Sequence, residues 1–72
     1  MARLTPNDYD ALERAVVRGG RLAVVRRGTE YLVIPTRIFQ RGGREAIEAV
    51  HPTTGDPIVF VLDDLDSIEA VT

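Results

Sequence analysis

The sequence predicts a mostly β fold in which one N-terminal α-helix precedes a small five-stranded antiparallel barrel. Its 72 residues suffice for one small domain. Helical periodicity ends at Gly19-Gly20, and short β-prone runs separated by glycine-containing turns fill the rest of the chain. Five short strands leave exposed edges unless the sheet curls and closes, so we expect closure.

The helix is expected over residues 5–18. Thr5 stands at the N-cap before Pro6, and Asp8 completes an approximate capping box. Arg14 and Arg18 suit the negative C-terminal end of the helix dipole. Apolar side chains recur at helical spacing and form one stripe: Tyr9, Leu12 and Val16. Two glycines then end the helix.

Five strands are expected after the helix, over residues 21–27, 30–40, 44–50, 57–62 and 67–71. Residues 44–50 are rich in Ala and Glu, which favour helices, but the segment is short for a helix between a Gly-Gly turn and His51-Pro52. Pro35 and Gly42-Gly43 are where the sheet should bend. Residues 1–72 are therefore expected to form a single SH3-like or Sm-like barrel domain with the helix over one end or face.

Charge is divided between the two parts of the chain. Residues 1–44 contain all nine arginines and four acidic residues, for a charge of +5, whereas residues 45–72 contain seven acidic residues and no base, for −7. Two interpretations are open. The basic part forms a face for an anionic partner, or the two parts pair with each other within one fold or between copies.

Several functional classes find no support in the sequence. There is no cysteine, the single histidine is His51, and no residue set resembles a catalytic constellation. The acidic run at residues 63–66 lacks the spacing and glycine of a calcium loop. We therefore expect no catalytic residue, no metal and no cofactor. The longest apolar run, residues 58–62, is too short to span a bilayer, and no secretory signal is visible, so we expect a cytoplasmic protein without membrane contact.

The candidate functional feature is a set of arginines at strand ends and turns, which we call the arginine rim: Arg21, Arg26, Arg27, Arg37, Arg41 and Arg44. Tyr31 is a candidate stacking partner because small barrels that bind single strands combine a basic groove with aromatic side chains. Phe39 and Phe60 are expected in the core instead. The rim predicts an anionic partner, either single-stranded nucleic acid or a small ligand.

The order of these segments resembles the WYL domain. The likeness is carried by a helix ending in Gly-Gly-Arg, by residues 31–35 leading to Ile38-Phe39, and by residues 60–68. The resemblance implies an Sm-like SH3 barrel of the kind found in bacterial regulators, usually behind a DNA-binding helix-turn-helix, that senses ligands or nucleic acid. The Trp-Tyr-Leu signature is absent because Ala46-Ile47-Glu48 stands at its place, so ligand contacts attributed to that signature are not carried over.

These observations predict a non-enzymatic regulatory or binding module that contacts an anion through the arginine rim. The alternative is a structural or assembly protein that forms homo-oligomers through its strand edges, with the basic part of one copy against the acidic part of the next.

Overall fold

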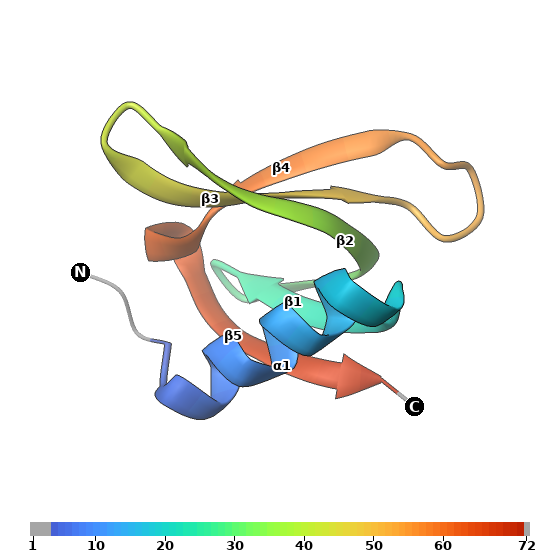
Figure 1. Cartoon of the computed structure of the whole chain (residues 1–72), viewed down its shortest axis with the longest axis horizontal. Coiled ribbons are helices and arrows are strands. Elements are labelled where there is room, and N and C mark those ends of the chain that lie inside the picture. The colour runs from blue at the N-terminus through green and yellow to red at the C-terminus, as the bar shows by residue number, and fades with distance from the viewer. Residues whose placement is uncertain (1–3, 72) are drawn as a thin grey trace.

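A computed structural model describes residues 4–71 and has the predicted order of one helix followed by an antiparallel five-stranded sheet (Figure 1). The elements are α1 (Pro6–Arg18), β1 (Arg21–Arg26), β2 (Thr29–Arg41), β3 (Arg44–Val50), β4 (Pro57–Val61), the 3-10 helix η1 (Leu62–Asp64) and β5 (Leu65–Val71). The mostly β fold class is confirmed, and residues 44–50 are a strand. The last strand begins at Leu65, two residues earlier than expected, because the 3-10 turn ends at Asp64 and the acidic run continues into the strand.

The helix has the ends that its sequence predicts. The Asp8 amide donates to Thr5 Oγ1 at 3.3 Å, and the Thr5 amide donates to Asp8 Oδ2 at 2.9 Å, so both halves of the capping box are present. Gly19 ends the helix in the left-handed conformation with φ 70°, which a glycine adopts without steric cost. Leu12 and Ala15 are the buried residues of α1.

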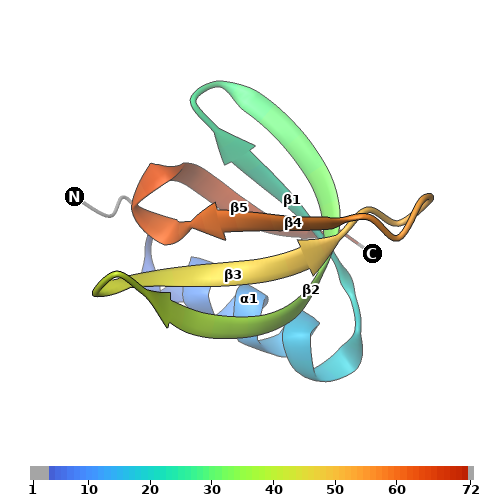
Figure 2. The same ribbon diagram turned by 90° about the horizontal axis from the view of Figure 1, so that it is seen from above.

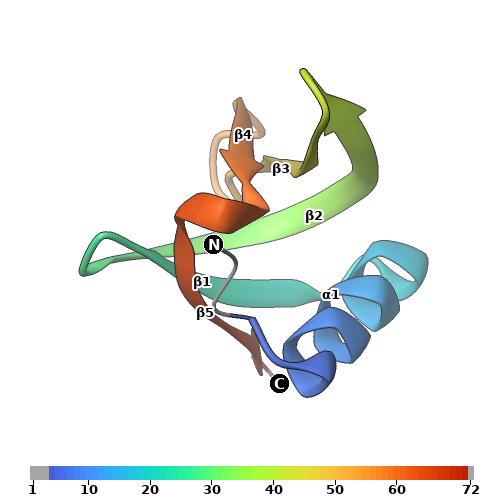
Figure 3. The same cartoon turned by 90° about the vertical axis from the view of Figure 1, so that its left-hand side faces the viewer.

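The strands run in the order β4-β3-β2-β1-β5, with antiparallel neighbours throughout. β2 has 13 residues and belongs to both halves of the sheet, pairing with β1 through its first half and with β3 through its second. The pairing register shifts between Pro35 and Arg37, where proline cannot donate to the ladder. Figure 3 shows β2 curving strongly between the two halves, so the expected bend near Pro35 is confirmed.

The expected closure of the sheet is wrong. β4 and β5 are the two edges of the sheet, and no ladder within residues 4–71 joins them. The chain passes from β4 to β5 through the single turn of η1, and the two strands diverge from this turn (Figure 1). Seen from above, β4 therefore lies in front of β5 (Figure 2). Because α1 packs against β5 and β2 and contributes Leu12 to the core, the interior is covered without a closing ladder.

The core contains apolar residues from the helix, all five strands and η1, among them Leu12, Leu22, Val33, Ile47, Phe60, Leu62 and Ile68. Phe60 is fully buried, as expected. Phe39 is the exception, because it is half-buried and lies outside the core cluster. Ile38 packs against the core after the register shift, and alternation along the strand therefore turns Phe39 to the opposite face. No helix in the described part of the chain is long and apolar enough to cross a bilayer.

Candidate functional site

The structure divides the predicted arginine rim among three places. Arg26 and Arg27 lie at the β1–β2 turn, and Arg21 begins β1 next to the end of α1. Arg41 and Arg44 lie at the β2–β3 turn, and Arg37 precedes them on β2. Figure 3 views the end of the molecule that carries both turns, and shows them on opposite sides with η1 between them. The open, bent sheet therefore separates arginines that a closed barrel was expected to gather on one rim.

At the β1–β2 turn, Arg26 contacts two aromatic side chains, Tyr31 and Phe60. Its guanidinium carbon lies 5.1 Å from the centroid of the Tyr31 ring and 5.3 Å from that of Phe60. The Arg26 Nη2 group also donates to the Tyr31 hydroxyl at 3.2 Å. The two rings meet edge to face with centroids 5.4 Å apart. Tyr31 is therefore in contact with both Phe60 and Arg26, and its role as a stacking partner for a base stays a prediction.

The two residues of the β1–β2 turn contact the acidic segment around η1. Arg27 and Gly28 have φ values of 51° and 81°, as a two-residue hairpin turn of this type requires. Arg27 Nη2 lies 3.9 Å from Asp64 Oδ1, and the Gly28 amide donates to Asp66 Oδ2 at 3.2 Å. Exposed pairs of this kind contribute up to about 1 kcal/mol. At this turn the basic and acidic parts of the chain meet within one fold.

The β2–β3 turn presents a different surface, which we call the hairpin face: Arg37, Phe39, Arg41 and Arg44. Gly42 and Gly43 have φ values of 58° and 78° and form the turn itself. The register pairs Arg41 with Arg44 directly across the ladder. Side chains two residues apart on a strand share one face, so the four residues project together away from the core.

Arg41 and Arg44 are exposed, and neither forms a hydrogen bond or ion pair with another residue in the range 4–71. Like charges directly opposite each other in an antiparallel pair destabilise the sheet. The hairpin therefore concentrates two positive charges at a position where the fold itself gains nothing from them.

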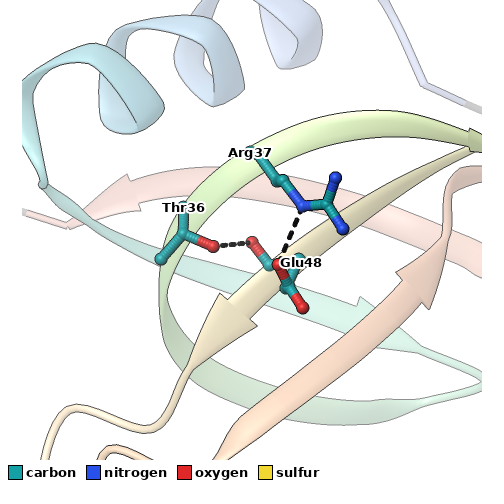
Figure 4. A network of polar contacts seen from close by, with 3 residues as sticks. All are labelled: Thr36, Arg37 and Glu48. Carbon is teal, nitrogen blue, oxygen red and sulfur yellow. Dashed lines mark hydrogen bonds and ion pairs between the residues drawn. The ribbon is translucent and has the colours of Figure 1, made fainter.

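Arg37 is held next to Phe39 at the base of the hairpin face. Its Nε donates to Glu48 Oε1 at 2.9 Å, and the Thr36 hydroxyl donates to the Glu48 carbonyl oxygen at 3.0 Å (Figure 4). The guanidinium carbon of Arg37 lies 4.6 Å from the centroid of the Phe39 ring. Glu48 fixes the orientation of this cation, and the guanidinium and the ring together form a stacked pair on the outside of the sheet.

The carboxylate nearest to Arg44 in sequence does not serve the hairpin face. Glu45 pairs with Gln40 across the ladder and lies on the other face of the hairpin. There it acts on Tyr9 of α1: burial raises the pKa of the Tyr9 phenol above its ordinary value, and the charge of Glu45, a hydrogen bond from the phenol to it and the charge of Asp63 raise it further.

Arg21 belongs to a groove that sequence reasoning missed. A groove of about 500 Å³ runs between α1 and the end of β5, and Arg14, Arg18 and Arg21 all contribute to its lining. The sequence predicts a helix-dipole role for Arg14 and Arg18 and an ion pair between Asp10 and Arg14. The signal that could have found them is their four-residue spacing on one helix face, together with a Gly-Gly cap that turns the next arginine back beside them.

In residues 4–71, no group of three or more His, Cys, Asp or Glu side chains is placed to hold a metal ion. His51 opens the β3–β4 turn: its amide donates to the Asp56 carbonyl oxygen at 3.0 Å, and its own carbonyl oxygen accepts from the Gly55 amide at 2.9 Å. The exposed guanidinium groups of the hairpin face have the charge and the hydrogen-bond donors that suit anions. No family model matches the chain, and no curated protein matches its sequence.

Proposed function

We propose that the protein is a non-enzymatic regulatory module that contacts single-stranded nucleic acid through the hairpin face. The role is of the kind that the resemblance to WYL domains implies. The observation that carries the proposal is the juxtaposition of Arg41 and Arg44 across a tight turn, with no acidic partner in the described chain and with the Arg37–Phe39 stack on the same face.

The chemistry of a single strand matches this surface in two respects. Its phosphates provide the negative charge that would offset the repulsion between Arg41 and Arg44, and guanidinium groups bind phosphate in a bidentate manner. An unstacked base can lie against the Phe39 ring or the Arg37 guanidinium, and such stacking contributes about 1–3 kcal/mol for each base. Duplex DNA offers phosphates without accessible base faces, so a single strand fits the face better.

The test is fluorescence anisotropy with a short labelled single-stranded oligonucleotide at low and at high salt. Release of counterions makes phosphate contacts weaken steeply as salt rises. We expect the double variant Arg41→Glu and Arg44→Glu to bind at least about tenfold more weakly at low salt, because each replaced charge now repels phosphate. Arg41→Lys with Arg44→Lys keeps the charge and should retain most of the affinity.

Arg27→Glu is the control at the other turn, because Arg27 is also exposed to solvent but lies next to Asp64. It should change affinity much less than the double variant does. Circular dichroism must show that every variant is folded. Absence of binding by the unchanged protein at low salt, or equal losses from the two turns, would contradict the proposal.

A second function is favoured by the open sheet. β4 and β5 are both sheet edges, and edge strands present unpaired amide and carbonyl groups to other chains. Pairing β4 of one copy with β5 of the next would build an assembly, with charge complementarity between basic and acidic parts. Light scattering across a salt series tests this alternative: it predicts an oligomer that loosens as salt rises, and a strict monomer at all concentrations eliminates it.

A further inference from the structure

We infer that the groove between α1 and the end of β5 is a binding site for a small organic phosphate monoester, separate from the hairpin face. The groove has a volume of about 500 Å³, within the range of about 300–1,000 Å³ that small-molecule sites occupy. Three arginines and a floor of apolar residues line the groove. The arginines suit the phosphate group of the ligand, and the apolar floor suits its organic part.

The basic side of the groove is built by local sequence. Arg14 and Arg18 are four residues apart on α1, so their side chains are neighbours on one helix face. The helix then ends at Gly19, and the Gly20 amide donates to the Ala15 carbonyl oxygen at 3.0 Å. This tight cap reverses the chain within two residues and brings Arg21 to the same groove at the start of β1.

These three arginines have no hydrogen bond or ion pair to any other residue of the described chain. The groove also contains Asp10, so its formal charge is +2. A phosphate monoester carries about −1.5 to −2 at neutral pH, which matches that charge better than a monocarboxylate does. The arginines are needed for this role, because the C-terminal end of a helix by itself repels anions.

The other side of the groove is apolar. Ala11 and Ala15 from α1 and Ala70 and Val71 from β5 line this side, and the two β5 residues are exposed. Inorganic phosphate would leave this floor in contact with water, whereas the organic part of an ester would cover it. Apolar area removed from water contributes roughly 25 cal/mol for each Å², so the ester should bind more tightly than phosphate alone.

Isothermal titration calorimetry of the full chain tests the site with three probes: adenosine 5′-monophosphate, inorganic phosphate and adenosine. We expect the nucleotide to bind at least about tenfold more tightly than either of the others, because only it uses both sides of the groove. Arg18→Ala with Arg21→Ala should weaken nucleotide binding by about tenfold or more, since two charge-assisted contacts are lost. Both side chains are exposed, so the fold should persist.

A second variant tests the apolar side without removing a charge. Ala70→Leu fills the floor at an exposed strand position, and should weaken the nucleotide more than it weakens inorganic phosphate. Arg27→Ala changes an exposed arginine outside both proposed sites and is the control, which should bind the nucleotide as the unchanged protein does. The inference is overturned if no nucleotide binds, if nucleotide and phosphate bind equally, or if the groove variants bind the nucleotide as the unchanged protein does. Failure here leaves the hairpin proposal intact, because the two sites share no residue.

Discussion

The β1–β2 and β2–β3 turns are similar in local sequence and geometry but differ in what surrounds them. Each is a two-residue turn with positive φ at both positions, and each has arginine beside or within it. At the first turn, Arg27 faces Asp64, and Arg26 covers two aromatic rings of the core. At the second, Arg41 and Arg44 face each other.

The comparison shows that the role of an arginine at a turn is determined by what the rest of the chain places opposite it. η1 and the start of β5 bring acidic side chains to the first turn from more than thirty residues away, as the hydrogen bond from Gly28 to Asp66 shows with its separation of 38 residues. No acidic side chain reaches Arg41 or Arg44 from the described part of the chain. The first turn is thus part of the fold, and the second is available to a partner.

The largest contrast in stability should come from replacing one arginine at each turn by alanine. Arg26→Ala removes a cation stacked on two rings and a hydrogen bond to Tyr31, and should lower the free energy of unfolding by about 2 kcal/mol. In a domain of this size that corresponds to a fall in Tm of roughly 10 °C. Arg41→Ala, the matched change, should leave Tm unchanged or raise it. Equal falls in Tm for the two variants in thermal melts would contradict the claim that only the first turn supports the fold.

A charge reversal at the second turn should raise the stability of the fold and weaken nucleic-acid binding. Arg44→Glu replaces the like-charge pair with an opposite-charge pair to Arg41, which should raise the free energy of unfolding by about 0.5–1 kcal/mol. The gain should shrink as salt screens the pair, while affinity for single-stranded oligonucleotide falls. Urea denaturation at two salt concentrations measures it. A loss of stability would show that the unpaired arginines already support the fold.

Removing the ion pair at the first turn should slightly lower stability and slightly strengthen oligonucleotide binding, which is the opposite of what Arg44→Glu should do. Asp64→Asn leaves Arg27 without its acidic partner, and because the pair is exposed the loss should be under about 1 kcal/mol. The freed arginine should slightly strengthen oligonucleotide binding at low salt. If binding instead weakens in anisotropy measurements, the acidic segment takes part in the interface.

The smallest effect concerns the pH response of Tyr9. Its raised pKa means that the neutral phenol is favoured in the folded state, so the resulting stability is full below the ordinary pKa of 10.0 and is lost as pH rises through the raised value. Glu45→Gln removes the second and third causes of the shift and should lower this pKa, while burial keeps it above the ordinary value. Ultraviolet titration of the phenol measures the change. An unaltered Tyr9 titration would place Glu45 elsewhere and make it a candidate partner of Arg44.

Local signals in the sequence predicted most of the fold. The Thr5–Asp8 capping box, the glycine turns and Pro35 act within a few residues, so the helix, the five strands and the bend followed from the residues themselves. The open sheet did not follow, because it depends on how η1 directs β5 away from β4. Phe39 was assigned to the wrong face because a one-residue register shift near Pro35 reverses which side chains point inward.

The candidate site was predicted only in part, for the same reason. Arginines at strand ends are visible in the sequence, but which of them meet an acid depends on long-range pairing. The interpretation that basic and acidic parts pair with each other describes Arg27 and Arg37, each of which has a carboxylate partner. Arg41 and Arg44 remain without one, and Arg14 and Arg18 join Arg21 only once the Gly19–Gly20 cap is seen in three dimensions.

The central claim is that the β2–β3 turn contacts nucleic acid and the β1–β2 turn does not. A titration of the labelled protein with single-stranded oligonucleotide, followed by the amide resonances of turn glycines in nuclear magnetic resonance spectra, reports on both turns at once. We predict that the Gly42 and Gly43 resonances shift with saturation while that of Gly28 stays in place. A shift at Gly28 with Gly42 and Gly43 unmoved would contradict the account.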